Sequence, residues 1–155
     1  MNEFIDASQT ISGFKKFSSA PTLLLANGVA PKKEFLQTIL DQCEAFIAID
    51  GGANVAKRYS ITPDIVIGDL DSCNENAQVK NTIHIEEQES NDLNKALDYC
   101  VKSGIKNIII LGAFGYRIDH FLTNMFVIKN YYKSLNLLAI CSLNAKTPGM
   151  GAYWL

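Results

Sequence analysis

Short apolar runs rich in β-branched residues alternate along this chain with segments that have helical periodicity. The predicted strands are residues 22–26, 45–49, 65–68, 82–86, 107–111 and 135–140. The predicted helices are residues 31–41, a short segment ending at 59, a segment that Gly104 stops, and residues 119–131. Helices that join successive strands produce a parallel sheet covered on both faces. We therefore predict an α/β fold, a three-layer sandwich with a mostly parallel, Rossmann-like sheet.

The composition fits one globular domain, because 48% of the 155 residues are hydrophobic. A net charge of −2 offers no basic footprint for nucleic acid and no charged patch for a membrane surface. No apolar stretch approaches the ~20 residues of a membrane span. The cysteines at 43, 73, 100 and 141 form no C-x-x-C pair, which fits a reducing compartment. We expect a cytoplasmic protein that binds neither nucleic acid nor membrane.

Within this single unit we assign residues 21–141 to the α/β domain. Residues 1–20 are mixed and Ser-rich, and we interpret them as a leader that packs loosely on the domain. Residues 142–155 show no strand alternation, and we interpret them as a short tail.

Two carboxylates follow the β-branched run Ile65-Val66-Ile67-Gly68, at Asp69 and Asp71. Acids at the carboxyl end of a buried strand suit Mg²⁺, which takes one or two protein carboxylates and completes its shell with water and phosphates. The alternative is local turn chemistry, in which Asp69 caps the next segment and Asp71-Ser72 forms an Asx-type turn. Both interpretations stand at this point.

Glycine turns and helix starts follow three other strands. In Asp50-Gly51-Gly52, adjacent glycines permit positive φ and close approach of the backbone to a phosphate, although a tight turn with Asp50 as a cap explains them equally well. Ser90 or Asn91 is placed to cap the helix that begins near Asp92, which by itself needs no ligand. The third such loop is the segment 112–120, which contains Arg117.

We expect these loops to lie close together, because the carboxyl ends of parallel strands meet at one edge of the sheet. That edge would hold the carboxylates of Asp50, Asp69, Asp71 and Asp92 together with Arg117. Capping does not require this combination, and the combination suits a magnesium–nucleotide site. The chain contains no G-x-x-x-x-G-K-[ST] and no G-x-G-x-x-G after its first strand, so neither a P-loop enzyme nor a dinucleotide oxidoreductase is indicated.

The motifs of this edge, in their order and spacing, resemble those of the thiamine pyrophosphokinase family over roughly residues 22 to 130. They are Asp50-Gly51-Gly52-Ala53-Asn54, Pro63-Asp64 followed by Gly68-Asp69-Leu70-Asp71-Ser72, Gln88 to Leu93, and Gly112 to Asn124. The resemblance implies Mg²⁺-dependent transfer of a pyrophosphoryl group from ATP to thiamine, giving thiamine diphosphate and AMP, by a homodimer.

The same resemblance implies roles for individual residues. Magnesium ligands fall on Asp50, Asp69, Asp71 and Asp92. Nucleotide contacts fall on Gly51, Gly52, Asn54, Gln88 and Asn91. Catalytic positions fall on Asp71, Asp92, Arg117 and Asp119, with Asp71 or Asp119 accepting the hydroxyl proton. His120 is interpreted as a helix-start residue and not as a base.

The chain departs from the family pattern in two places. Tyr116 occupies a position where many family members have a second glycine. The family also carries a C-terminal β-sandwich domain that contributes to the thiamine pocket at a dimer interface, and we expect this chain, which ends at Leu155, to lack it. The alternative function is therefore a truncated Mg–ATP-binding remnant or regulatory module that does not turn over thiamine.

Overall fold

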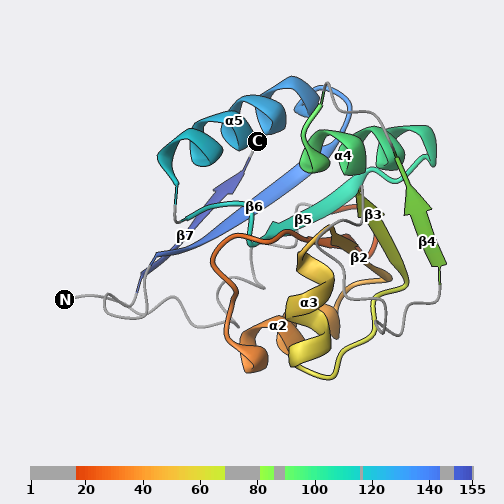
Figure 1. The fold of residues 1–155 in the computed structure, drawn as a ribbon. Coiled ribbons are helices and arrows are strands. Elements are labelled where there is room, and N and C mark those ends of the chain that lie inside the picture. Colours follow the sequence, from red (N-terminus) through yellow and green to blue (C-terminus); the bar gives the residue numbers. More distant parts are fainter. Residues whose placement is uncertain (1–16, 69–80, 86–89, 116, 144–148, 155) are drawn as a thin grey trace.

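A computed structural model describes residues 17–68, 81–85, 90–115, 117–143 and 149–154 (Figure 1). The strands are β1 (Thr22–Leu25), β2 (Ala45–Ile49), β3 (Ile65–Gly68), β4 (Asn81–His84), β5 (Asn107–Leu111), β6 (Asn136–Leu143) and β7 (Gly149–Trp154). The described helices are α2 (Lys33–Leu40), α3 (Gly52–Arg58), α4 (Asp92–Lys102) and α5 (Ile118–Tyr131).

The strands form one sheet in the order β4-β3-β2-β1-β5-β6-β7. Strands β1 to β6 are parallel, and β7 alone runs antiparallel, beside β6. From β1 the chain builds outward through β2, β3 and β4, and it then returns to place β5 on the other side of β1. The direction of winding therefore reverses between β1 and β5, where open α/β sheets bind their ligands.

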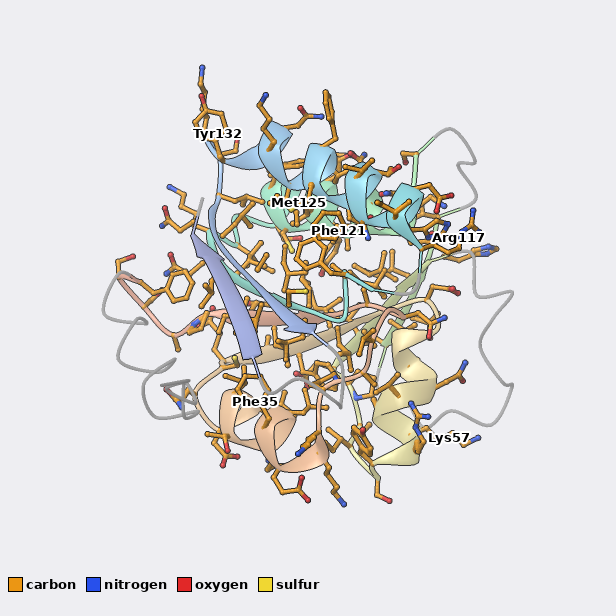
Figure 2. The ribbon with its side chains drawn as sticks, turned by 90° about the vertical axis from the view of Figure 1, so that its left-hand side faces the viewer. Phe35, Lys57, Arg117, Phe121, Met125 and Tyr132 are labelled. Carbon is orange, nitrogen blue, oxygen red and sulfur yellow. The ribbon has the colours of Figure 1, made fainter. Side chains whose placement is uncertain are left out.

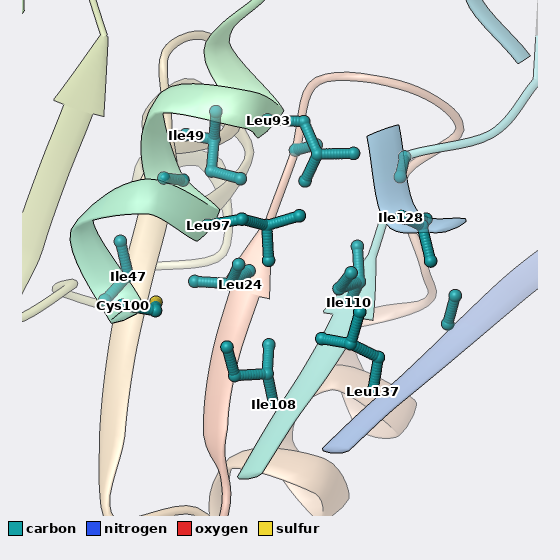
Figure 3. Close-up of a cluster of buried hydrophobic side chains, with 14 of the residues drawn as sticks. Leu24, Ile47, Ile49, Leu93, Leu97, Cys100, Ile108, Ile110, Ile128 and Leu137 are labelled. Carbon is teal, nitrogen blue, oxygen red and sulfur yellow. The ribbon is translucent and has the colours of Figure 1, made fainter. Parts of the chain in front are cut away.

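Helices cover both faces of the sheet, because successive strand residues point to opposite sides. Leu24, Ile108 and Ile110 pack under α4 and α5, in a core that includes Leu97 and Cys100 of α4 (Figure 3). Their strand neighbours point the other way and pack against Leu36 and Ile39 of α2 and Val55 of α3; these are Leu23, Leu25, Ile109 and Leu111. The predicted three-layer, mostly parallel α/β fold is confirmed.

The interpretation of residues 142–155 as a tail without a strand is wrong. Strand β6 continues to Leu143, and residues 149–154 form β7, which pairs with β6 from Leu138↔Trp154 to Leu143↔Gly149. The free edge of β6 supplies backbone hydrogen-bond partners to any extended segment. A strand made by backbone pairing at a sheet edge needs no alternation of side chains, and the glycine-rich sequence of β7 has none.

Two further observations bear on the sequence analysis. Most of the predicted leader, and Cys73, lie outside the described residues. In the part of the chain that the structure describes, no helix is both long enough and apolar enough to cross a membrane.

Candidate functional site

A cleft of about 370 Å³ opens at the carboxyl ends of the parallel strands, over the β1–β5 junction. Its lining comes from five segments: the loop after β1 (26–28), the end of β2 (49–50), the start of α4 (91–93), the loop after β5 (112–115) and the N-terminal half of α5. The last segment contributes His120 and Asn124 of α5 and Arg117, the N-cap residue just before the helix. The cleft therefore lies where the winding of the sheet reverses.

Backbone hydrogen bonds join the loops after β1 and β5 beneath the cleft. The amide of Gly28 donates to the carbonyl of Gly112 at 2.6 Å, and the amide of Val29 donates to that of Phe114 at 3.1 Å. Gly112 has a φ of +69°, and a Cβ there would lie 2.5 Å from the carbonyl oxygen of Ala26. Only glycine fits this conformation and this spacing, so the sequence fixes the pairing of the two loops.

The turn from β2 to α3 uses its glycines differently from the prediction. The positive φ, +44°, is at Asp50, and the N-cap residue of α3 is Gly51, which has no side chain that could cap the helix. A Cβ on Gly51 would lie 2.2 Å from Nδ2 of Asn27, and one on Gly52 would lie 2.0 Å from the carbonyl oxygen of Leu25. The absence of side chains on the two glycines lets the end of β1 and its loop pack closely against this turn. The interpretation of Asp50 as the cap of α3 is wrong. Backbone strain of this kind at Asp50 is common at binding sites, and aspartate tolerates it better than most residues.

The start of α4 presents Asn91 and Asp92 to the cleft. Asn91 is the N-cap, and its Oδ1 accepts the amide hydrogen of Asn94 at 2.8 Å, which confirms the predicted cap. Oδ1 of Asp92 lies 3.2 Å from Nζ of Lys95, whose side chain is only 5% exposed. A buried cation in the first turn opposes the helix dipole, and the Asp92 carboxylate offsets that cost.

The mouth of the cleft carries an ion pair between Arg117 and Asp119. Nε of Arg117 donates to Oδ1 of Asp119 at 3.0 Å, and Nη2 donates to Oδ2. This fork lowers the pKa of Asp119, and it raises the pKa of Arg117. Arg117 lies at one end of α5, and Phe121 and Met125 extend from the helix toward the sheet (Figure 2). Phe121 also packs against Phe114 of the β5 loop, with 5.2 Å between ring centroids.

A comparison with protein-family models matches residues 36–139 to "Thiamin pyrophosphokinase, catalytic domain", more than half of the chain. The chain belongs to this family. Thiamin pyrophosphokinase 1 of Caenorhabditis elegans is 32% identical to it over 90 residues, which cover 51% of this chain and 37% of that protein.

Solved thiamin pyrophosphokinases share the fold. The enzyme of Bacillus subtilis is 25% identical with a TM-score of 0.63, over 77% of this chain and 60% of its own. The Candida albicans enzyme, at 20% identity, shows the fold alone, with a TM-score of 0.64 over 81% of this chain and 59% of its own. This chain therefore spans about three fifths of the length of these solved relatives and less of the curated one.

The structure brings together part of the site that the family resemblance implies. Asp50, Asn91, Asp92 and Arg117 line the cleft, and Asp119 holds Arg117 at its mouth. The remaining predicted residues are not among the lining: Gly51, Gly52 and Asn54 belong to the turn and first residues of α3, and Asp69, Asp71 and Gln88 lie outside the described residues.

Sequence reasoning missed several residues that the structure places at the site. Asn27, Gly28, His120 and Asn124 line the cleft, and the buried Lys95 pairs with Asp92. Asn27 and Gly28 follow β1, so the reversal of winding beside β1 is the signal that identifies them. Helical periodicity does not predict that Lys95 is buried, because it lies about 200° around α4 from the apolar residue Leu93.

The donor set fits a magnesium ion held partly by substrate. Asp50 and Asp92 bring two carboxylates to the cleft from different elements. Across the described residues, no group of three or more His, Cys, Asp or Glu side chains is arranged to hold a metal alone. Mg²⁺ is commonly bound by one or two carboxylates plus phosphate oxygens and water. The cleft thus suits a metal that arrives with a polyphosphate.

Proposed function

We propose that this chain acts as a thiamin pyrophosphokinase, binding Mg–ATP in the cleft and transferring its β,γ-pyrophosphoryl group to thiamine. The observation that carries the proposal is the cleft over the β1–β5 junction, with Asp50 and Asp92 on its walls and Arg117 at its mouth. Family membership supplies the reaction, because the relatives that share the fold are named for it.

In this reaction the hydroxyl oxygen of thiamine forms a bond to the β-phosphorus of ATP. The bond from that phosphorus to the oxygen bridging the α-phosphate breaks, AMP leaves, and the hydroxyl proton passes to a base. Such displacements need positioning and charge neutralisation more than covalent help. Bound Mg²⁺ would neutralise phosphate charge, held by Asp50 and Asp92 together with Asp69 and Asp71, which the sequence predicts.

Arg117 would face the transferred group with the part of its guanidinium that Asp119 does not occupy. Its fork to Asp119 engages Nε and Nη2, so the Nη1 hydrogens remain directed elsewhere. The hydrogen bond from Arg117 lowers the pKa of Asp119, so Asp119 carries a charge that can hold the guanidinium. We therefore assign to Asp119 the orientation of Arg117, and Asp71 stays the other candidate for accepting the hydroxyl proton.

The proposed enzyme is a cytoplasmic homodimer. Three large apolar side chains form an outward stripe on successive turns of α5: Ile118, Leu122 and Phe126, which are 79%, 60% and 68% exposed. The stripe begins one residue after Arg117, so a second copy packed on it would lie beside the cleft mouth. Burial of such side chains stabilises association by about 1.5–3 kcal/mol each.

The decisive experiment measures AMP release from Mg–ATP with and without thiamine, alongside calorimetric binding of Mg–ATP. We expect thiamine-dependent AMP formation that requires Mg²⁺. Asp50→Asn preserves the size of the side chain and tolerates the positive φ, so it should weaken Mg-dependent ATP binding without loss of folding. Asp41→Asn, an exposed position at the end of α2, is the matched control.

Two results would contradict the proposal. Mg–ATP binding without thiamine-dependent AMP release would favour the alternative function, a nucleotide-binding module that does not turn over thiamine. Failure to bind Mg–ATP, or equal binding by the Asp50→Asn and wild-type proteins, would show that the cleft is not an Mg–ATP site that uses Asp50.

A further inference from the structure

Two asparagine side chains connect the walls of the cleft in series. Nδ2 of Asn124, in the middle of α5, donates to the carbonyl oxygen of Ala113 in the β5 loop at 2.6 Å. Oδ1 of Asn124 accepts from Nδ2 of Asn91 at 3.1 Å. Oδ1 of Asn91 in turn accepts the amide hydrogen of Asn94 at 2.8 Å. One continuous chain of hydrogen bonds thus runs from the β5 loop, through α5, into the first turn of α4.

The chemistry at both ends determines the direction of this chain. The carbonyl of Ala113 can only accept, so the amide nitrogen of Asn124 must face it. The backbone amide of Asn94 can only donate, so the oxygen of Asn91 must face it. The remaining groups, the nitrogen of Asn91 and the oxygen of Asn124, are then donor and acceptor to each other. An asparagine side chain supplies the donor and the acceptor on two separate atoms, so each can face a different partner.

The position of the chain suggests more than helix packing. Ala113, Asn91 and Asn124 all line the cleft, and Asn91 directly precedes Asp92. Asparagine is also a poor residue for a helix interior, where it competes with the backbone for hydrogen bonds. Its presence at 124 therefore costs helical stability, which its two hydrogen bonds offset.

We propose that Asn124 is a positioning residue, which sets the start of α4, and with it Asn91 and Asp92, at the correct distance from the β5 loop for the phosphates of the nucleotide. This inference rests on the proposed function for its ligand, Mg–ATP. It assigns to Asn124 no contact with the reacting atoms.

A second contact between the same two helices provides a matched control. The hydroxyl of Tyr131 donates to Oδ1 of Asp98 at 2.5 Å, two turns along α4 from Asn91, and its oxygen also lies 3.3 Å from Oδ1 of Asn94. Tyr131, Asp98 and Asn94 do not line the cleft. Tyr131→Phe therefore removes contacts between α4 and α5 whose residues do not line the cleft, whereas Asn124→Leu and Asn124→Ala remove the one between two lining residues.

Calorimetry with Mg–ATP and thermal unfolding should separate the two contacts. We expect Asn124→Leu and Asn124→Ala to raise the dissociation constant of Mg–ATP about 3- to 10-fold, the effect of one neutral hydrogen bond. Tyr131→Phe should lower the melting temperature and leave the dissociation constant within about twofold. Equal weakening of binding by all three variants, or unchanged binding by the Asn124 variants, would overturn the proposal.

Amide hydrogen exchange tests the same inference without any nucleotide. Asn124→Leu should accelerate exchange at the amide of Asn94, because the Asn91 cap loses its anchor. Tyr131→Phe removes contacts to oxygen atoms of Asn94 and Asp98 but none to that amide, so it should accelerate exchange there less. If the wild-type chain fails to bind Mg–ATP, the proposed function fails while exchange at Asn94 still reports whether the anchor exists. Unchanged exchange at Asn94 in Asn124→Leu would show that Asn124 does not hold α4.

Discussion

Arg117 donates two hydrogen bonds, from Nε and Nη2, to the carboxylate of Asp119, although the two side chains are 67% and 58% exposed. An exposed pair of this kind contributes little to stability. A planar fork nevertheless restricts the orientation of the guanidinium, and that orientation matters where phosphate is bound. This restriction fits the proposed contact of Arg117 with the transferred group.

The first prediction separates an orienting Asp119 from a catalytic base. If Asp119 only orients Arg117, Asp119→Asn should lower kcat/KM by no more than about fivefold, the range of an exposed ion pair. Loss of a general base costs about 100- to 10,000-fold. Steady-state AMP formation measures the difference.

The double-mutant cycle sharpens that test. In an Arg117→Ala background, Asp119→Asn should have almost no further effect, because a residue that acts through Arg117 has nothing left to orient. A large additional loss, or disappearance of the acidic limb of the pH–rate profile in Asp119→Asn, would identify Asp119 as the base instead.

The second prediction concerns pH. The hydrogen bond from Arg117 lowers the pKa of Asp119 in the folded chain. A depressed carboxyl pKa means that the ion pair is fully formed above the ordinary aspartate range and is lost only as pH falls through the lower folded value. Arg117→Ala should therefore raise the pKa of Asp119, as observed by NMR titration of its carboxyl carbon. An unchanged titration would mean that the pair does not form in solution.

The third prediction concerns Gly52, where helix propensity and packing give opposite signs. Propensity alone favours Gly52→Ala by at most about 1 kcal/mol, the value for a helix interior, because Gly52 is the first residue of α3. The added Cβ would lie 2.0 Å from the carbonyl oxygen of Leu25, in the central strand β1. Overpacking against rigid backbone costs about 1–3 kcal/mol, so we expect a net loss in the free energy of unfolding. Denaturant unfolding measures this loss.

The matched pair Lys57→Gly and Lys57→Ala, at an exposed position of the same helix, reports the propensity contribution alone. A Gly52→Ala variant that is more stable than wild type would show that β1 and α3 separate easily.

The fourth prediction concerns the α5 stripe. Phe126→Glu places a charge in the centre of the exposed apolar residues, and we expect it to shift the chain toward a monomer in sedimentation experiments. Tyr132→Glu, at an exposed position beyond the helix, is the control. Wild-type chain that stays monomeric at every concentration would contradict the homodimer.

The sequence by itself determined the class of fold and every described element except β7. The β-branched runs, the amphipathic face of α4 and the cap at Ser90 or Asn91 are local signals, because each depends on residues within a few positions of one another. The predicted site residues are also local signals in the sequence. The structure places Asp50 and Asp92 at the cleft, whereas the roles of Asp69, Asp71 and Gln88 stay predictions. Family motifs added the chemistry that these patterns alone left open.

Only the tertiary structure decided how the elements meet. The order of strands, and hence the reversal beside β1, places Asn27 and Gly28 in the cleft. The close approach of α3 to β1 explains Gly52, and the series from Ala113 through Asn124 to Asn91 joins residues far apart in sequence. Strand β7 depends likewise on the free edge of β6. These features follow from contacts between distant segments, whose geometry is set by backbone packing and hydrogen bonding and leaves no periodic trace along the chain.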